Sequence, residues 1–298
     1  MQTDRPLDII VAGEANVDLL VHDAPRLELG KEKLAPAMDL TLGGSSSITA
    51  FNLARLGARV GFVGVVGQDL FGRFVEERLY SSGVDLKHLL RPAGLKTGVT
   101  IWHLRGARRA GVTYTGAIAA LKASDVPASY LARARHLHVG AYFLLRALHP
   151  AAPALFRGAR RLGLTTSLDC NYDPAETWDS GIRRVLRQTD VFLPNEDEAR
   201  RITGTSRVSI AAEALARLAR IVVVKRGAKG VLVHSRESCF EMPAVRVRAL
   251  DATGAGDSFN AGFLASFVRG ASLEQCARAG VEAGARAVTR FGGADAFE

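Results

Sequence analysis

The chain has 298 residues and a mass of 31.8 kDa, with 48% hydrophobic and 23% charged residues, which is typical of a globular protein with one large α/β domain or two smaller ones. A net charge of +9 would suit a nucleic-acid partner, but the arginines are dispersed, aromatic residues make up only 7%, and no nucleic-acid module signature appears. No apolar run approaches the ~18 residues of a membrane span, and three scattered cysteines indicate structural thiols in a reducing compartment.

Predicted strands and helices alternate along the chain, which favours a mostly parallel sheet with helices on both faces. The first strand, LDIIVAG, begins almost at the N-terminus, so we expect no signal peptide and a cytoplasmic protein. Further strands are predicted in RVGFVGVVG, HLHVGAYF, TTSLDC, DVFLP, IVVVKRG and the alternating stretch from Val245 to Leu250. Helices are predicted over residues 46–56, 71–80 and 154–161, in two stretches over 195–219, and from about 255 and 273. We interpret residues 1–298 as a single domain.

Two stretches, approximately residues 15–42 and 95–118, interrupt this alternation with short β segments punctuated by Gly and Pro. TGVTIWHL and GVTYTG alternate like the strands of a hairpin around GARRA. We predict that the two stretches pair into a small sheet beside the main domain. The alternative is that both are long surface loops, which are less usual inside compact domains.

GEANVD, residues 13–18, follows the first strand, at the edge where open parallel sheets bind ligands. Asn16 and Asp18 are two residues apart, so in an extended segment both side chains face one side. An amide and a carboxylate together suit the hydroxyls of a sugar, although an Asn-x-Asp turn is also common without a ligand.

A pair of glycines, Gly43 and Gly44, precedes the predicted helix in TLGGSSSITAFNLARLG. Serines follow the glycines directly, and we predict that Ser45 or Ser46 caps this helix.

Two stretches in the second half of the chain carry further local signals. In PNEDEAR, Asn195 is a predicted N-cap, and Glu198 at the third helical position would complete a capping box. VVVKRGAKG, residues 222–230, is a strand followed by a tight glycine turn. It is not a Walker A loop, because the spacing G-x-x-x-x-G-K-[ST] is absent.

The most informative stretch is DATGAGDSFNAGF, residues 251–263, which connects a predicted strand to a helix. Its glycines allow several backbone N–H groups to point into one concavity, and the helix dipole adds positive potential there, so the turn predicts an anion site. Asp257 inside an anion site would repel the anion unless it had a proton to take. Attack by a hydroxyl on a phosphoryl group needs both features: amides for the phosphoryl charge and a carboxylate for the proton. The simpler alternative, a first-turn acid stabilised by the dipole, does not explain the glycines, Asp251 and Thr253 together.

This stretch resembles the C-terminal signature of the ribokinase-like (PfkB) carbohydrate kinases, D-T-x-G-A-G-D-x-F, and the resemblance extends over nearly the whole chain. The resemblance implies a three-layer α/β/α fold with a small β-sheet lid, and an ATP- and Mg²⁺-dependent kinase that forms a homodimer through this lid in many members. It also implies that Asp257 is the catalytic base and that Gly254, Ala255 and Gly256 line the anion hole.

Further site residues are implied by the same resemblance. Asn16 and Asp18 match the N-x-D sugar-binding element, and Gly43 and Gly44 match a double glycine that lets the backbone approach the sugar. The other matches are Asn195 and Glu198, which help to organise Mg²⁺ and phosphate; Lys225, Gly227 and Gly230, which contact the nucleotide; and Asp251 and Thr253, which hold a monovalent cation such as K⁺ in potassium-activated members. An exposed, functionally neutral lysine is the alternative for Lys225.

The acceptor is predicted to be a small neutral sugar. Ile48 stands where the family usually carries Asn, and Ser45 stands where ribokinases carry Lys. The loss of these two polar sugar contacts argues against ribose as the acceptor, although Ser47 could replace them in part. In TSLDCNYDP, Asp173 stands where 2-keto-3-deoxygluconate kinases commonly carry an Arg, and it would repel an acidic sugar. The alternatives are a nucleoside kinase, a kinase of such sugar acids and, because of Ile48, a non-catalytic sugar sensor. A dinucleotide-dependent oxidoreductase is a further alternative, but no proper G-x-G-x-x-G follows the first strand.

Overall fold

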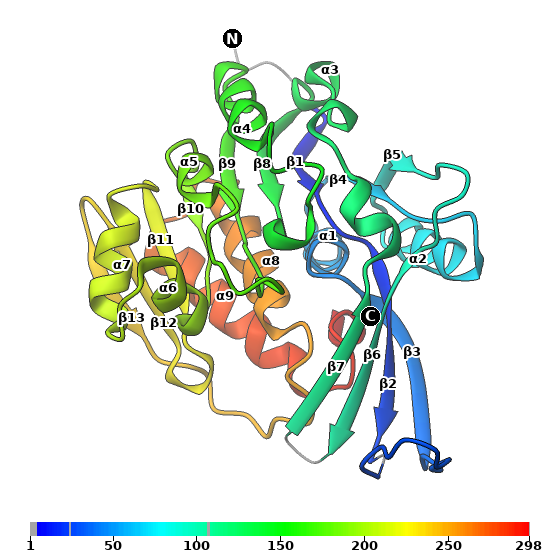
Figure 1. The fold of residues 1–298 in the computed structure, drawn as a ribbon. Coiled ribbons are helices and arrows are strands. Elements are labelled where there is room, and N and C mark those ends of the chain that lie inside the picture. Colours follow the sequence, from blue (N-terminus) through cyan, green and yellow to red (C-terminus); the bar gives the residue numbers. More distant parts are fainter. Residues whose placement is uncertain (1–4, 24, 106–107, 298) are drawn as a thin grey trace.

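The computed structural model describes residues 5–23, 25–105 and 108–297. Residues 1–4, on which the expectation about a signal peptide partly depends, and residues 106–107, at the predicted hairpin turn, lie outside the described residues. The main sheet has the strand order β13-β12-β11-β10-β9-β8-β1-β4-β5 and is parallel except at β12 and β13 (Figure 1). Its strands are β1 (Leu7–Ala12), β4 (Val60–Val65), β5 (Asp85–Leu90), β8 (Ala134–Val139), β9 (Thr165–Leu168), β10 (Val191–Phe192), β11 (Ile221–Lys225), β12 (Val231–Ser235) and β13 (Cys239–Met242).

Helices cover both faces of this sheet, which confirms the three-layer α/β/α prediction (Figure 1). The α-helices are α1 (Ser45–Arg55), α2 (Leu70–Ser81), α3 (Ala128–Leu131), α4 (Ala152–Arg161), α5 (Ile182–Leu186), α6 (Glu196–Thr203), α7 (Val208–Ala216), α8 (Ala255–Phe267) and α9 (Leu273–Ala287). Short 3₁₀ turns lie at Gly116–Ala120, Ala123–Asp125, Tyr142–Leu144, Gly227–Lys229 and Asp295–Phe297. None of the helices in the described residues combines the length and apolar character that crossing a bilayer requires.

The inner strands of the main sheet, such as β1, β4 and β11, are buried on both faces and supply side chains to two cores. In β1, Ile9 and Val11 pack with α1, α2, α8 and α9, whereas Ile10 and Ala12 pack with α3 to α7. This arrangement explains why the strands are continuous apolar runs rather than alternating ones. The parallel strands therefore end at one common edge, where GEANVD, TSLDCNYDP and PNEDEAR follow them.

A second sheet pairs the two interrupting stretches, as predicted. It consists of β2 (Asn16–His22), β3 (Ala37–Gly43), β6 (Gly98–Arg105) and β7 (Arg108–Tyr114), in the order β3-β2-β6-β7 (Figure 1). Strands β2 and β6 are parallel neighbours although they are far apart in the sequence, and β3 and β7 add as antiparallel edges. Since β2 begins directly after β1, the sheet grows out of the ligand edge of the main domain.

One predicted strand is wrong. The stretch from Val245 to Leu250 has no sheet partner within the described residues and runs as an extended loop between β13 and α8. Val245, Val247 and Leu250 are 42–48% exposed, so their alternation does not reflect a buried strand face. The DATGAG turn consequently connects a loop, rather than a strand, to α8.

Candidate active site

A cavity of about 1230 Å³ is lined by residues from the ligand edge of the main sheet, from the second sheet and from the N-terminus of α8. Its size exceeds the roughly 300–1,000 Å³ of a typical single-ligand site. Thirteen of the sixteen predicted site residues line it, in an order that runs from the second sheet to β11: Asn16, Asp18, Gly44, Asp257, Gly254, Ala255, Gly256, Thr253, Glu198, Asn195, Lys225, Gly227 and Gly230. Gly43, Ser47 and Asp251 are the predicted residues that do not line it.

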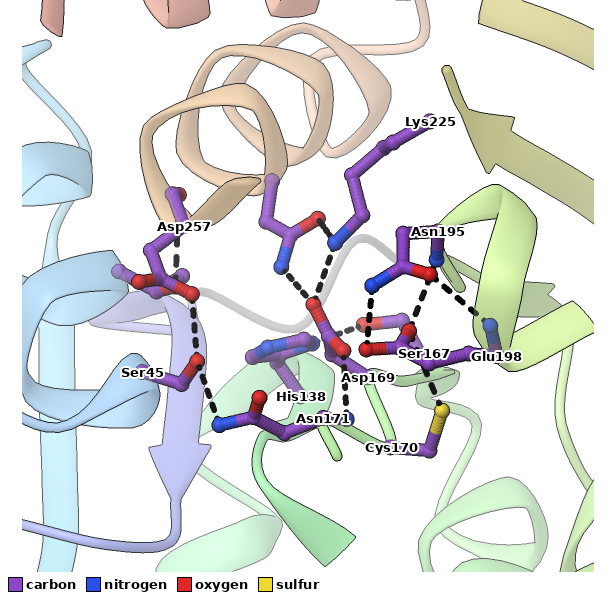
Figure 2. Close-up of polar contacts among 12 residues, drawn as sticks. Ser45, His138, Ser167, Asp169, Cys170, Asn171, Asn195, Glu198, Lys225 and Asp257 are labelled. Carbon is purple, nitrogen blue, oxygen red and sulfur yellow. Dashed lines mark hydrogen bonds and ion pairs between the residues drawn. The ribbon is translucent and has the colours of Figure 1, made fainter. Parts of the chain in front are cut away.

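Asp257 stands in the first turn of α8 and lines the cavity. The Ser45 hydroxyl donates a hydrogen bond of 2.5 Å to Asp257 Oδ1, so the N-terminus of α1 orients this carboxylate (Figure 2). Burial, followed by the negative charge of Asp169, raises the pKa of Asp257 to about 6. A carboxylate with such a pKa is ionised at neutral pH and still holds a proton more strongly than an ordinary aspartate, which suits a general base.

Helix α8 begins at the glycine turn, as the sequence predicts. Gly254 is the N-cap residue and has φ 69°, in the left-handed region that glycine adopts without strain. A side chain at this position would also collide with the backbone of Gly293, because its Cβ would stand 2.2 Å from Gly293 Cα. Gly254, Ala255 and Gly256 line the cavity beside Asp257 at the N-terminus of α8, which is the geometry of an anion site, while the N–H of Ala255 donates to the carbonyl oxygen of Ala252 at 3.3 Å.

Asn16 and Asp18 point to the same side of β2, as their spacing predicts. Asn16 Nδ2 donates to Asp18 Oδ1 at 3.2 Å and to Thr100 Oγ1 of β6 at 3.3 Å. Gly43 lies behind both side chains: a Cβ there would stand 2.2 Å from Asp18 Oδ1. Gly43 thus makes room for the two acceptor-site side chains, whereas Gly44 lines the cavity itself.

The serines at the start of α1 do not act as predicted. Gly44 is the N-cap residue of α1 and no side chain caps it, so the predicted cap at Ser45 or Ser46 is wrong. Ser45 instead donates to Asp257, while Ser47 Oγ donates to the carbonyl oxygens of Gly43 and Gly44. Ser47 is fully buried and its hydroxyl is already engaged by this backbone, so the structure does not favour it as a sugar contact.

Lys225 is a buried member of a charged cluster, so the alternative of an exposed lysine is wrong. Its side chain is 13% exposed, and Nζ lies 2.6 Å from Asp169 Oδ2 and 3.2 Å from Asn260 Oδ1 (Figure 2). A Cβ built on Gly256 would lie 3.5 Å from Lys225 Nζ, which places the ammonium beside the anion turn. Lys225 holds the pKa of Asp169 below its usual range despite complete burial.

Asn195 and Glu198 form the predicted capping box at the start of α6. Glu198 N donates to Asn195 Oδ1 at 2.9 Å, and Asn195 N donates to Glu198 Oε2 at 2.8 Å. Asn195 Nδ2 also donates to Glu198 Oε1 at 2.6 Å, and burial raises the pKa of Glu198 to about 7 (Figure 2). Since both carboxylate oxygens are occupied, these residues fit a water-mediated hold on Mg²⁺ better than direct ligation.

Asp251 and Thr253 organise the turn ahead of α8. Asp251 Oδ1 accepts from the backbone N and the hydroxyl of Thr253, at 2.9 and 2.8 Å, and Oδ2 accepts from Gly292 N at 3.1 Å. Asp251 is buried, so these three bonds satisfy its carboxylate within the protein. They give both residues a structural role that does not depend on a cation.

The cavity also contains residues that the sequence reasoning missed. Asp169 and Asn171, Glu14, and Trp102 with Arg109 all line it. Asp169-x-Asn171 directly follows a strand, and the sequence offered that signal. The other side chains come from turns and from β6 and β7, and only the pairing of the second sheet brings them to the cavity.

Asp173 does not have the role that the sequence suggested. Its carboxylate accepts hydrogen bonds from the backbone N of Ala175 and Trp178 and from the hydroxyl of Thr177, at 3.0, 2.7 and 3.1 Å. It is buried within its own turn and does not line the cavity. Asp173 therefore gives no argument against an acidic acceptor.

The comparison with known protein families decides the identity of the fold and the chemistry. A model of the pfkB family of carbohydrate kinases matches residues 7–298. The chain belongs to this family. It is a kinase that transfers a phosphoryl group to an alcohol, and family membership rules out the dinucleotide-dependent oxidoreductase.

Relatives of this pfkB-family kinase carry several substrate names. It is 30% identical to a cytidine kinase of Thermococcus kodakarensis over 96% of this chain and 98% of that protein. It is 29% identical to a nucleoside kinase of Methanothermobacter thermautotrophicus over 93% and 87% of the two chains, and 28% identical to a 5-dehydro-2-deoxygluconokinase of Geobacillus kaustophilus over 87% and 81%.

Solved structures of the family share the fold of this kinase. A putative ribokinase II of E. coli, in complex with ATP and Mg²⁺, superposes with a TM-score of 0.86 at 24% identity, covering 98% of this chain and 96% of that one. A PfkB protein of Polaromonas sp. JS666 gives a TM-score of 0.82 at 27% identity, covering 95% and 96%.

Proposed function

We propose that this kinase transfers the γ-phosphoryl group of Mg·ATP to a hydroxyl of a neutral sugar or of the sugar moiety of a nucleoside. The observation that carries the proposal is the position of Asp257, which stands at the N-terminus of α8 in the same cavity as Asn16 and Asp18. A hydroxyl held by Asn16 and Asp18 then lies between a base and an anion site. ATP and its phosphates need the rest of the cavity, towards Lys225.

In the proposed reaction, the acceptor oxygen attacks the γ-phosphorus and the proton of its hydroxyl passes to Asp257. A bond forms between the acceptor oxygen and phosphorus, and the bond between phosphorus and the β,γ-bridging oxygen breaks, so that ADP leaves with that electron pair. The backbone N–H groups at Gly254–Gly256 stabilise the charge on the transferring group. Ser45 keeps the Asp257 carboxylate directed at the acceptor.

The adenosine part of ATP is proposed to lie at the far end of the cavity. Residues of the loop after β13 and of α9 line this end, and most are small or apolar: Ala244, Val245, Val247, Ala249, Val281, Gly284, Ala285 and Val288. The positions in α9 recur at spacings of three and four, which places them on one helix face. Gly230 supports this end, because a Cβ there would lie 1.9 Å from the carbonyl oxygen of Met242 and would separate the β-hairpin.

Asn195 and Glu198 would hold Mg²⁺ through water, and the ion would neutralise phosphate charge when bound. We also propose K⁺ as an activator near Asp251 and Thr253. Replacing K⁺ by Na⁺ at constant ionic strength tests this; equal turnover in both salts contradicts it. The three cysteines are free, which supports the proposed cytoplasmic location, where thiols stay reduced.

A panel of acceptors with ATP tests the function directly. Sugars, nucleosides and sugar acids are incubated with the enzyme and Mg·ATP, and ADP release is coupled to an absorbance change. We expect turnover of a neutral sugar or a nucleoside. No ADP release with any acceptor contradicts the proposal and favours the sugar-sensor alternative.

A nucleoside acceptor is supported by two relatives named for nucleosides and by the exposed aromatic ring of Tyr172, which lines the cavity. A purine or pyrimidine base can stack on such a ring. A sugar acid is the second candidate, because Arg109 and Arg146 line the cavity and a relative is named for an acidic sugar. The acceptor with the highest kcat/KM in the panel separates the two.

We propose a homodimer through the outer face of the second sheet. The in-register row Leu40–Leu19–Ile101–Val112 crosses all four strands on one face, while the row Thr41–Asp18–Thr100–Thr113 faces the other way. Val112 is 71% exposed, Leu40 and Ile101 in the same row are each 39% exposed, and Met38 and Tyr114 on the two edge strands are 62% and 58% exposed, so apolar side chains are exposed across this face. Light scattering should give a dimer for the wild type and a monomer for Val112→Lys; a monomeric wild type contradicts the proposal.

A further inference from the structure

Arg109 reaches from the second sheet across the cavity to the turn ahead of α8. It belongs to β7, and its Nη1 donates a hydrogen bond of 2.7 Å to Thr253 Oγ1. Thr253 directly precedes the Gly254–Gly256 turn. This hydrogen bond therefore links a side chain of the second sheet directly to the anion turn.

The position of Arg109 is prepared by two neighbours. Its guanidinium stacks on the Trp102 ring, 4.5 Å from the centroid. The Trp102 ring in turn lies against Gly111 of β7, where a Cβ would come within 2.6 Å of two ring carbons. Glycine at position 111 therefore lets the indole lie flat on the sheet, and the indole supports the planar guanidinium on its cavity side.

The charge of Arg109 also acts on the reacting groups. Burial raises the pKa of Asp257 to about 6 and that of Asp18 to about 7, and Arg109 is one of the positive charges that oppose both shifts. Its guanidinium therefore lies within electrostatic reach of the carboxylates on either side of the transferring group. Lys225 approaches the same turn from the opposite side but is engaged by Asp169.

Resting on the proposed function, we propose that Arg109 is a further catalytic residue: it contacts the γ-phosphoryl group during transfer and stabilises the charge that develops on it. A guanidinium donates from a rigid fork to two phosphoryl oxygens at once, which a hydroxyl such as Thr253 cannot do. Because Arg109 is carried by the second sheet, transfer depends on this sheet lying over the anion turn.

Steady-state kinetics separates this role from acceptor binding. With the best acceptor of the panel, we expect Arg109→Ala to lower kcat by about 100- to 1000-fold, as for other groups that stabilise transferring phosphoryl charge, while both KM values change less than about threefold. Arg109→Lys should recover part of kcat. Arg105→Ala is the matched control. Arg105 lies in the same hairpin, and its position alternates with Ile101 onto the outer face of the sheet, away from the cavity. We expect its turnover to stay within about twofold of wild type.

Trp102 offers a second readout that needs no acceptor. The chain has two tryptophans, so Trp178→Phe leaves Trp102, which lies under Arg109, as the single tryptophan, and excitation at wavelengths that tyrosine does not absorb reports on it alone. We expect a non-hydrolysable ATP analogue with Mg²⁺ to change its emission more than Mg·ADP does, because only the former attracts Arg109 to a γ-phosphate. Adding Arg109→Ala should make the two nucleotide responses equal.

Each result bears on one of the two proposals. An Arg109→Ala enzyme with unchanged kcat, or one in which only the KM of the acceptor rises, overturns the role of Arg109 and leaves the kinase function standing. The same holds if the difference between the two nucleotides persists without Arg109. A wild-type protein that binds neither nucleotide overturns the proposed function itself.

Discussion

Replacing Asp257 by Asn tests the assigned base and its effect on folding in one variant. Burial and the charge of Asp169 raise the pKa of Asp257 from 3.8 to about 6. An asparagine keeps the size of the side chain and an oxygen that accepts the Ser45 hydrogen bond, but it cannot take a proton. We expect kcat to fall by about 10²- to 10⁴-fold, while the free energy of unfolding at pH 8 increases.

The size of the increase follows from the pKa. The difference between about 6 and 3.8 is about 2 units, and each unit corresponds to ~1.4 kcal/mol, so the ionised carboxylate destabilises the fold by at most about 3 kcal/mol. The side chain faces the cavity and is partly solvated, which screens the charge, so we expect a gain of about 1–2 kcal/mol.

The sign of the pH dependence is fixed by the same shift. The folded state binds this proton more tightly than the unfolded chain does, so the wild type loses stability as pH rises from 3.8 through about 6. The difference between Asp257→Asn and wild type should therefore be large at pH 8 and small near pH 4.

Urea unfolding followed by far-UV circular dichroism at both pH values measures this difference. Glu213→Gln, an exposed acid on α7 with 57% side-chain exposure, is the control, and we expect its effect to stay within about 0.5 kcal/mol. Near-normal turnover of Asp257→Asn refutes the assignment of the base. A variant that is less stable than wild type at pH 8 refutes the electrostatic reasoning.

Three further variants and conditions test the rest of the site. The acidic limb of the pH profile of kcat/KM should have its midpoint near pH 6, because protonated Asp257 cannot accept the acceptor proton; a midpoint near pH 4 contradicts the raised pKa. Gly43→Ala should lower acceptor turnover at least about tenfold, because its Cβ would stand 2.2 Å from Asp18 Oδ1. Gly83→Ala is the control: its Cβ would meet nothing within 4 Å, so the φ of 86° at this position should affect only stability. Lys225→Met should reduce the free energy of unfolding by about 3 kcal/mol or more, because it leaves the Asp169 carboxylate without its cation. Adding Asp169→Asn should recover much of this loss, and equal stability of the single and double variants in urea contradicts the reasoning.

Much of the fold could be predicted because its signals are local. Continuous apolar strands, amphipathic helices and the Gly254 turn each lie within a few residues of one another, and the alternation of strands and helices then favours a parallel sheet. The failure at Val245–Leu250 has the same origin. Alternation in a short segment also arises when apolar side chains line a ligand cavity, and Val245, Val247 and Ala249 of this stretch line the proposed adenosine end.

The candidate site was predictable only where a motif carries it. Asp257, Asn16 and Asn195 stand in short patterns with a chemical reason for each position. Trp102 and Arg109 stand in an ordinary strand pattern, and only the register of β6 and β7 against β2 turns them towards Asp257. The pairing register of strands that are distant in the sequence cannot be read from local patterns, so the sequence did not predict that Trp102 and Arg109 line the cavity.

The charges of the cavity explain why a phosphate-transfer site can contain so many acids. Glu14, Asp18, Asp169, Glu198 and Asp257 all line it, against a buried lysine that Asp169 already engages. Burial raises the pKa of Glu14 to about 8, so this group is mostly neutral at pH 7 and does not repel a phosphate. Arg109, Arg146 and Arg246 also line the cavity and offset part of the remaining negative charge. Under the proposed function, Mg²⁺ would bring further positive charge with ATP, and Arg109 would add its charge from the second sheet beside the transferring phosphoryl group.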